Sequence, residues 1–378
     1  MEKRRIADLT AFRRELHQFP EVSQKEKETQ KRILDFLRRN GIKGQQAGGT
    51  GVMVVFDSGK PGKTIMLRSD HDALPIQEIN DFDYKSKNEG ISHKCGHDGH
   101  TAIMCGVASH FHKNPISHGK LALIFQPAEE NGEGAKAILG DPAFNFQPDH
   151  VFALHNLPGY PLHQIVYKEH NFTAAAKSII IKLHGKTSHA AEPELGINPA
   201  KAISELISLF EQEAQPDLKR DDFALTAPIY LHMGERSYGV SAGYGEVHYT
   251  LRTWSSEVMD DLANRLLNGI EVITGSHKLT YTIDWAEAFE SNKNDPRAVK
   301  YILDAAKSND FDTHQREWPF KWGEDFGLFT QKFPGAMFGI GSGEDCPALH
   351  NPDYDFPDAI IETGIKMFTT IVEKALNE

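Results

Sequence analysis

The chain has 378 residues, of which 39% are hydrophobic and 25% are charged, as in an ordinary globular protein. This length exceeds what usually packs around one hydrophobic core, so two domains are expected. The net charge of -12 argues against a nucleic-acid-binding surface and against attraction to anionic membranes.

Neither a targeting segment nor a membrane anchor is expected. Charges are scattered through the opening "MEKRRIADLTAFRRELHQFP", and no run in the chain approaches the roughly 18 apolar residues that span a bilayer. The three cysteines are odd in number and widely spaced, which does not fit a disulfide framework. We therefore expect a cytoplasmic protein in which Cys95 is free to act as a thiolate ligand.

Two amphipathic helices are predicted at the start of the chain. Apolar residues at three- and four-residue steps predict a helix from Ile6 to Phe19, stopped by Pro20. A second helix is predicted at residues 24–40, with Gly41 as its C-terminal stop. The mixed-sign run "KEKETQKR" is interpreted as the solvated face of that helix.

Short apolar runs then alternate with helical segments. Continuous apolar strands separated by helices predict a mainly parallel sheet that is buried on both faces, the α/β pattern. The closing section returns to this pattern, with a helix after Pro296, the strand "AMFGIG" and a last helix at residues 358–376. The earlier runs are "VMVVF", "TIMLRSD", "LALIFQ" and "VFALH", with a helix at residues 99–113.

A different pattern lies between these two sections. Its order reads strand, helix, strand, strand, helix, strand, and several of its strands alternate polar and apolar residues. This alternation predicts a sheet with one solvated face. We therefore expect a smaller α+β domain at residues 172–288, inserted into a larger catalytic α/β domain that consists of residues 1–171 and 289–378.

Acidic and imidazole side chains recur at the ends of the predicted strands of the larger domain. Ligands of open α/β sheets bind beyond the carboxyl ends of the strands, and the loop "KCGHDGH" adds more such groups before a helix. Imidazole, carboxylate and thiolate together suit zinc or another divalent metal, and more than four candidates indicate two metals. The strand-end candidates are Asp70, His71, Asp72, Glu129, Glu130, His155 and His350.

The adjacent acids Glu129 and Glu130 could have two different roles, metal binding and proton transfer. One carboxylate could bind metal while the other takes a proton from water and passes it to a leaving amine. Their spacing leaves open which residue has which role.

Seven motifs, in this order, resemble those of a known group of enzymes. This group is the amidohydrolase branch of the dinuclear-metal aminoacylase and carboxypeptidase peptidases, which includes hippurate hydrolases, N-acyl-amino-acid deacylases and auxin-conjugate hydrolases. The resemblance spans nearly the whole chain, and "CGHDGHTA" with "QPAEE" is its most specific part. The motifs are "RSDHDALPIQE", "CGHDGHTA", "IFQPAEE", "ALHNLP", "GKTSHAA", "HYTLRTW" and "ALHNPDYDF".

The resemblance assigns roles to residues of the larger domain. Glu129 matches the carboxylate that acts as general base and general acid, and Asp72 matches a carboxylate that orients a metal-bound imidazole. His93, Asp98 and His100 are expected to pack or hydrogen-bond around the ligands. The metal ligands implied are Cys95, His97, Glu130, His155 and His350.

The resemblance also assigns roles to the inserted domain, which relatives use as a lid and for homodimerisation. His189 matches an imidazole that reaches the metal centre of a partner subunit and stabilises an oxyanion. Arg252 matches a guanidinium that grips the substrate carboxylate. Asn198 is either a substrate-facing amide or a helix cap before Pro199.

Three positions depart from the family pattern. His71 replaces a residue that is usually apolar, and we expect it to be structural or to support the ligands from behind, rather than to be a sixth ligand. Thr187 and Ser188 replace small glycines near His189. Lys94 replaces a small residue beside the expected thiolate ligand, where its charge either lowers the thiolate's proton affinity or points to solvent.

The sequence thus predicts a hydrolase that uses two divalent metals, zinc or manganese, with cobalt and nickel as alternatives. Its expected reaction is cleavage of the amide of a small N-acyl amino acid or conjugate, by a metal-bound water with Glu129 as base. Two alternatives remain open: a dipeptidase or aminopeptidase with the same metal chemistry, and a non-catalytic, metal-stabilised binding module.

Overall fold

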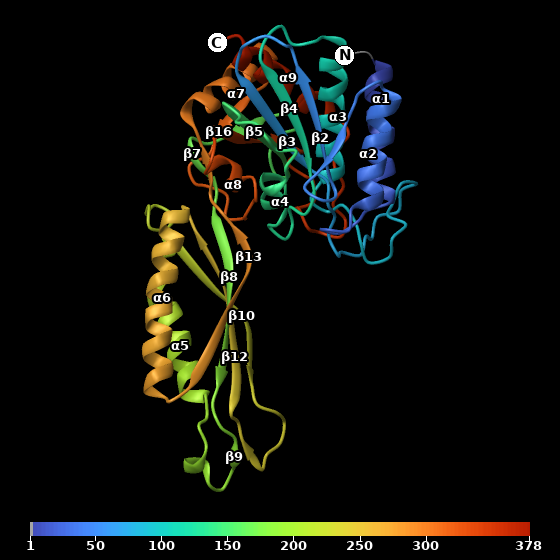
Figure 1. Cartoon of the computed structure of the whole chain (residues 1–378). Coiled ribbons are helices and arrows are strands. Elements are labelled where there is room, and N and C mark those ends of the chain that lie inside the picture. The colour runs from blue at the N-terminus through green and yellow to red at the C-terminus, as the bar shows by residue number, and fades with distance from the viewer. Residues whose placement is uncertain (1–2) are drawn as a thin grey trace. The chain divides into compact units, whose positions relative to one another are not determined.

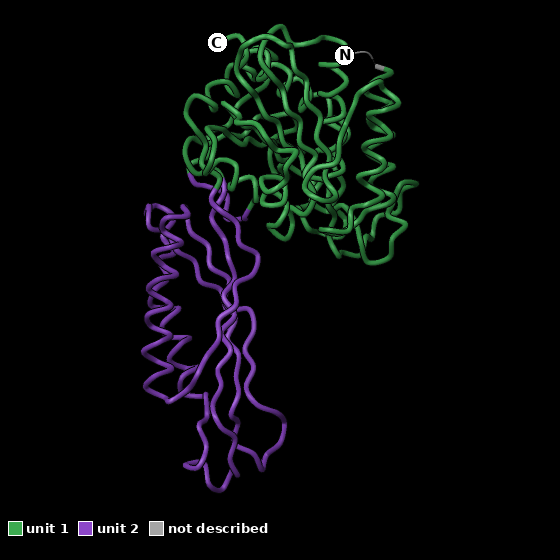
Figure 2. Tube along the Cα trace, viewed as in Figure 1, with its two compact units in different colours: residues 1–172, 292–317, 324–378 green, residues 173–291, 318–323 purple. Residues whose placement is uncertain are grey.

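The computed structural model describes residues 3–378 and divides the chain into two compact units (Figures 1 and 2). Unit 1 consists of Met1–Phe172, Asn292–Glu317 and Glu324–Glu378, and unit 2 consists of Thr173–Ser291 and Trp318–Gly323. The domain boundaries predicted from the sequence assign residues 318–323 to the larger domain. In the structure this segment belongs to unit 2, where an isolated parallel bridge joins Phe320 to Thr173.

Unit 1 is built on an eight-stranded mixed sheet in the order β1-β2-β4-β3-β5-β16-β6-β15. The central pairs β4–β3, β3–β5 and β5–β16 are parallel, whereas β2 and β6 each run antiparallel to a neighbour. The predicted α/β class with a mainly parallel sheet is confirmed. The strands are β1 (Gln45–Ala47), β2 (Gly51–Asp57), β3 (Thr64–Asp70), β4 (Lys120–Gln126), β5 (His150–Leu157), β6 (Ile165–Tyr167), β15 (Thr313–Gln315) and β16 (Gly335–Gly341).

Helices flank this sheet (Figure 1), and they include the five that the sequence predicts together with two short helices, α4 and α8, that it does not. The helix α3 contacts both α1 and α9, and almost all of its residues are buried, so it forms part of the core. Gly41, two residues after α2, adopts a φ of 76°, the left-handed conformation that commonly ends a helix. The helices are α1 (Lys3–Gln18), α2 (Lys27–Arg39), α3 (His97–Lys113), α4 (Gly134–Gly140), α7 (Pro296–Ser308), α8 (Gly327–Thr330) and α9 (Ile360–Leu376).

Unit 2 is a four-stranded antiparallel sheet in the order β10-β12-β8-β13, with two helices packed on one face (Figure 1). Buried and partly exposed residues alternate along β12, so the other face of the sheet is open, as the sequence predicts. The elements are β8 (Ala175–His184), β9 (Ser188–His189), a 3-10 turn (Pro193–Leu195), α5 (Ala200–Glu213), β10 (Ala224–Met233), β11 (Val240–Ser241), β12 (Tyr244–Thr253), α6 (Ser256–Ser276) and β13 (Thr280–Phe289).

Two short strands, β7 (His170–Thr173) and β14 (Asn292–Asn294), pair where the chain leaves and re-enters unit 1. No helix in the described part of the chain is both long and apolar enough to cross a membrane.

Candidate metal centre

The candidate site lies at the carboxyl ends of the central strands of unit 1. Asp70 ends β3, Glu129 and Glu130 follow β4, and His155 lies near the end of β5. His350 lies on the loop after β16, and Cys95 and His97 lie at the start of α3. Strands that are parallel in the sheet therefore bring these residues to one edge, the usual ligand-binding edge of an open α/β sheet.

A glycine allows α3 to begin inside this crowded region. Gly96 precedes the helix with a φ of 94°, in the left-handed region that other residues adopt at a cost. A Cβ atom at this position would lie 2.5 Å from Oδ1 of Asn156 on β5. Only glycine lets Cys95 and His97, on either side of it, approach β5 so closely.

The expected metal ligands converge in two overlapping groups. Ligand atoms of Cys95, His97 and His155 lie within 4.8 Å of one another, and so do those of Cys95, Glu130 and His350. The Sγ atom of Cys95 is 3.5 Å from Nε2 of His155. Because Cys95 belongs to both groups, the arrangement has the form expected of two adjacent cation sites that share one ligand.

The two buried imidazoles turn the same ring nitrogen toward this cluster. His97 donates its Nδ1 proton to Oδ1 of Asp72, 3.1 Å away, and His155 donates its Nδ1 proton to the Asn156 carbonyl at 2.8 Å. With the Nδ1 proton held in this way, a neutral ring carries its lone pair on Nε2, as it would when a metal replaces the second proton. Imidazoles that bind metals are usually held in this way by an outer acceptor.

Buried polar atoms without partners test whether the site fits metal ions. Among the described residues, Nε2 of His97 and Oε1 of Glu130 are buried and have no hydrogen-bond partner. Leaving such groups unpaired costs about 1–3 kcal/mol each, so natural structures normally satisfy them. A divalent cation would satisfy both atoms, and the set of imidazole, carboxylate and thiolate donors suits zinc and its neighbours.

The electrostatics of the site favour a cation. Burial raises the pKa of Glu129 well above its usual range, with Glu324 and Glu130 adding to the effect, and it also raises the pKa of Cys95. Burial lowers the pKa of His97, but the nearby carboxylates, chiefly Asp70, outweigh it and raise the pKa to about 10. The cluster is thus a buried region of negative potential.

The two adjacent acids occupy different surroundings. Oε2 of Glu130 is 3.6 Å from Nε2 of His350, which places Glu130 among the expected ligands. Glu129 is 4.0 Å from His97, and its Oε1 accepts a long hydrogen bond, 3.4 Å, from the backbone N–H of Asp325. Glu129 therefore lies between two groups of side chains: its ligand atoms are within 4.8 Å of those of His97 and Glu130, and also of those of Glu324 and Asp325.

A buried ion network that sequence reasoning missed supports this region. The fully buried guanidinium of Arg68 contacts Asp70 at 2.5 Å, Glu324 at 2.7 Å and Asp325 at 2.6 Å. Asp325 also accepts the backbone N–H of Ala135 at the start of α4. The sequence carried a signal for this network, because a charge inside the apolar run "TIMLRSD" needs buried partners.

Polar residues around the cluster form hydrogen bonds with one another, as expected of Asp98 and His100. His100 lies between Asp70, 2.5 Å from Nδ1, and Asn156, 2.6 Å from Nε2. Asp98 accepts hydrogen bonds from the buried side chains of Arg13 and His17. Burial lowers the pKa of His71 to about 4, and no metal-type group among the described residues includes it.

Lys94 does not point to solvent, so that interpretation of its side chain is wrong. The side chain is fully buried, and its Nζ atom lies 2.5 Å from Oε1 of Glu78. Sequence alone could not identify this partner, which lies 16 positions earlier in a loop.

The three expected substrate-binding residues all belong to unit 2. His189 is exposed, and its Nδ1 accepts the backbone N–H of Ala191 at 3.0 Å, so a neutral ring carries its proton on Nε2. Arg252 donates to the backbone carbonyl of Lys321 at 2.7 Å. Asn198 accepts the N–H of Ala200 at the start of α5, which is the contact expected of a helix cap.

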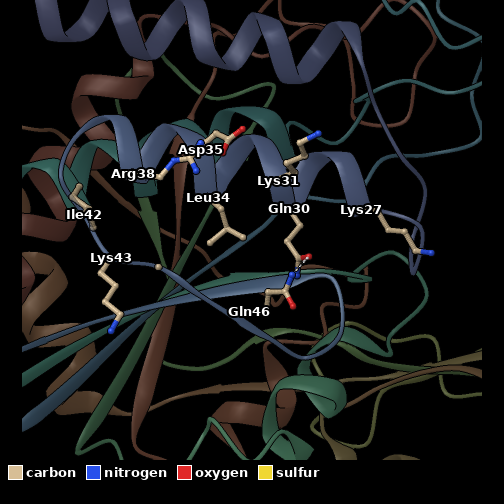
Figure 3. A pocket seen from close by; sticks show the side chains of 10 residues that line it. Lys27, Gln30, Lys31, Leu34, Asp35, Arg38, Ile42, Lys43 and Gln46 are labelled. Atoms are coloured by element: carbon tan, nitrogen blue, oxygen red, sulfur yellow. Dashed lines mark hydrogen bonds and ion pairs between the residues drawn. The ribbon is translucent and has the colours of Figure 1, made fainter.

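A separate surface hollow of unit 1 does not coincide with this site. It has a volume of about 510 Å³ and lies between α2 and residues 42–46 (Figure 3). Lys31 extends from the upper side of α2 and Arg38 lies beside Asp35, while Lys43 points down from the opposite wall. These cations do not converge, and the hollow contains none of the expected site residues.

Comparison with known proteins decides the family. Residues 66–374 match the model of the peptidase family M20/M25/M40. The chain belongs to this family. The resemblance seen in its motifs is thereby confirmed, and the M20 chain is a hydrolase of amide bonds that depends on metal.

Individual relatives align with nearly the whole of the M20 chain. An N-acetyldiaminopimelate deacetylase of Listeria innocua is 30% identical over 371 residues, which are 97% of this chain and 99% of the relative. A Bacillus subtilis protein described as a dinuclear metal-binding peptidase of the M20 family is 27% identical, with a TM-score of 0.85 and coverage of 100% and 99%. A structure from methicillin-resistant Staphylococcus aureus is 25% identical, with a TM-score of 0.90 and coverage of 99% and 97%.

Proposed function

We propose that this enzyme hydrolyses the amide bond of small N-acylated amino acids, using two divalent metal ions and Glu129. The observation that carries the proposal is the convergence of five expected ligands in two groups that share Cys95. Two of these ligands, His97 and Glu130, each have a buried ligand atom without a hydrogen-bond partner, which a cation would satisfy.

The ligands would be Cys95, His97 and His155 for one ion and Cys95, Glu130 and His350 for the other. When bound, divalent cations at this site would polarise the substrate carbonyl and make water a better nucleophile at neutral pH. Zinc or manganese is proposed for both positions, with cobalt and nickel as alternatives. Mass spectrometry of the protein's metal content, with two equivalents expected, tests this assignment.

Glu129 is proposed to move the proton. Its carboxylate takes a proton from the attacking water, and the protonated acid returns it to the leaving amine nitrogen as the C–N bond breaks. The backbone N–H of Asp325 fixes one carboxylate oxygen, which leaves the other to face the reacting atoms. Asp72 orients the His97 imidazole through its Nδ1 proton.

Two residues of unit 2 are proposed to bind the substrate. Arg252 would pair with the free carboxylate of the amino-acid half, and the carbonyl of Lys321 already holds one side of its guanidinium fork. The Nε2–H of His189 would donate to the oxyanion of a partner subunit's substrate. Asn198 is a weaker candidate, because its side-chain oxygen already caps α5.

The substrate class rests on the relatives together with Arg252. Because relatives over nearly the full chain are named N-acetyldiaminopimelate deacetylases, that compound is the first to test. The metal-loaded protein should release acetate from it or from simpler N-acetyl amino acids faster than it cleaves N-benzoyl analogues or dipeptides. Faster cleavage of dipeptides would favour a peptidase, and no turnover at all with two ions bound would favour a binding module.

The role of Arg252 can be tested on one substrate pair. An Arg252→Met enzyme should show a raised KM for an N-acetyl amino acid but an unchanged KM for its carboxamide, which has no charge to lose. An equal rise for both compounds would contradict the proposed carboxylate contact.

We also propose a homodimer formed through unit 2. β10 is an edge strand of its sheet, and it exposes Ile229, Tyr230, Leu231 and Met233, each more than 40% accessible. Apolar edge strands of this kind are normally covered, and a second copy can pair with the open edge. Light scattering should show a dimer that Leu231→Lys dissociates, whereas Val272→Lys, on α6 of the same unit, leaves it intact.

A cytoplasmic location is proposed as well. Cys95, Cys105 and Cys346 are all free thiols in the structure, and a ligand thiolate needs a reducing compartment. Fractionation of cells that produce the protein tests this assignment.

A further inference from the structure

Lys94 is an unusual neighbour for the expected ligand Cys95, because lysine side chains are almost never fully buried unless they are paired. Its ammonium donates to Oε1 of Glu78 at 2.5 Å and to the backbone carbonyl of Tyr354 at 2.8 Å. The second bond joins segments 260 positions apart in the sequence. The side chain of Lys94 therefore ties the loop before α3 to the loop after β16.

The backbone of Lys94 makes a second tie to the same loop. Its carbonyl accepts the backbone N–H of His350 at 2.7 Å. His350 has a φ of 65°, a left-handed conformation that costs a non-glycine residue roughly 1–2 kcal/mol. Lys94 thus binds the loop after β16 at two points four residues apart, at His350 and at Tyr354.

The other partner of the ammonium is itself fixed. The carboxylate of Glu78 accepts the backbone N–H of Ser86 at 2.6 Å and lies 3.0 Å from Nε2 of His17. His17 in turn contacts Asp98, the residue after the expected ligand His97, at 2.9 Å. Glu78 is therefore a rigid acceptor that does not depend on Lys94 for its position.

We propose that Lys94 is a positioning residue that holds His350 in place for metal binding before any metal arrives. The inference rests on the proposed function, in which Cys95 and His350 are ligands of the same ion. A site whose ligands are already ordered binds its ion more tightly, because less conformational entropy is lost on binding. Lys94 thus replaces the small residue usual at this position with a direct link between two ligand loops.

The test compares two variants of the full-length protein. Lys94→Met/Glu78→Gln removes the ammonium together with one negative charge, so the net charge of the buried cluster is unchanged. Glu78→Gln alone perturbs the same cluster but keeps the bond from Lys94 to Tyr354. For each protein, dissociation constants of two cobalt ions are measured by competition with a chelator, and stability is measured on the metal-free protein.

The double variant should bind one of its two ions about 10- to 100-fold more weakly than Glu78→Gln does, the range typical of residues that orient ligands. The affinity for the other ion should change less, because two of its three expected ligands, His97 on α3 and His155 on β5, lie outside the loop that carries His350. Equal losses at both ions would overturn the inference, since a general loss of structure acts on both. So would unchanged affinities.

Hydrogen exchange on the wild-type protein gives a test that needs no variant to fold. In the metal-free protein the amide of His350 should be protected, because it already donates to Lys94. Rapid exchange without metal, with protection only after loading, would overturn the inference. A wild-type protein that binds fewer than two ions would instead contradict the proposed function, so the two failures are distinguishable.

Discussion

Asp72 accepts a hydrogen bond from the imidazole of His97, 25 positions later in the chain, across 3.1 Å. Its second carboxylate oxygen accepts the backbone N–H of Glu130 at 3.0 Å and the hydroxyl of Ser23 at 2.8 Å. One carboxylate therefore orients two of the expected metal ligands. To orient both ligands, the side chain of residue 72 must offer a hydrogen-bond acceptor at each of its two terminal atoms.

An Asp72→Asn protein should bind metal about 10- to 100-fold more weakly. Asparagine has one acceptor oxygen, so its NH₂ group must face a donor on one side. The measurement is metal affinity by chelator competition, with Asp304→Asn on the exposed face of α7 as the control. Unchanged affinity in Asp72→Asn would contradict the orienting role.

A Glu129→Gln protein should lose about 100- to 10,000-fold in turnover while it keeps its two metals, because the amide cannot accept the proton from water. Turnover and metal content are measured on the same sample. Glu133→Gln is the matched control, since Glu133 lies in the same loop but is exposed. Loss of metal from Glu129→Gln would instead make Glu129 a ligand.

His17 makes stability depend on pH in a defined direction. Burial lowers its pKa, but hydrogen bonds to Asp98 and Glu78 outweigh burial and raise the pKa to about 9. The unfolded imidazole titrates near 6.5, so the folded state binds the proton more tightly. This stabilisation is fully present below pH 6.5 and is lost as pH rises toward 9.

The free energy of unfolding of unit 1 should therefore fall between pH 6.5 and 9, by about 3 kcal/mol more than in a His17→Gln protein. Circular dichroism during urea unfolding measures it. All four tryptophans, Trp254, Trp285, Trp318 and Trp322, lie in unit 2, so their fluorescence gives an internal control. A parallel fall in both signals would contradict an effect local to His17.

An Arg68→Met protein should be destabilised by about 3–5 kcal/mol, because Asp70, Glu324 and Asp325 would be left buried without a cation. The same unfolding measurement applies. Arg38→Met is the control, because Arg38 is 80% exposed and its ion pair with Asp35 is on the surface. A loss no larger than the control's would mean that the three acids become protonated at little cost.

The sequence predicted the long elements of the fold because their patterns are local. The strands β3, β4 and β5 are continuous apolar runs, which indicate burial on both faces without reference to any partner. Strands of three residues, such as β1 and β15, carry too few residues to show a period. Their existence depends on the neighbouring strand rather than on their own composition.

The site was predictable only as far as residue types reveal their chemistry. Cys95 and His97 before a helix and Glu130 after a strand stand out because thiol, imidazole and carboxylate groups of this kind gather for few reasons other than metal binding. The burial of Lys94 was not predictable, since it depends on a carbonyl 260 positions away. The role of Asp325 was not predictable either, because it depends on hydrogen bonds from Arg68 and Gln126, which are distant in the sequence.

The position of β16 between β5 and β6 has a consequence for how the protein is made. The strands that flank it are synthesised early, whereas β16 is synthesised only after the whole of unit 2. Until then the nascent sheet carries an open seam with unpaired backbone groups on both sides. A protein truncated before Gly335 should therefore aggregate rather than fold, and the enzyme can take up its full complement of metal only near the end of translation.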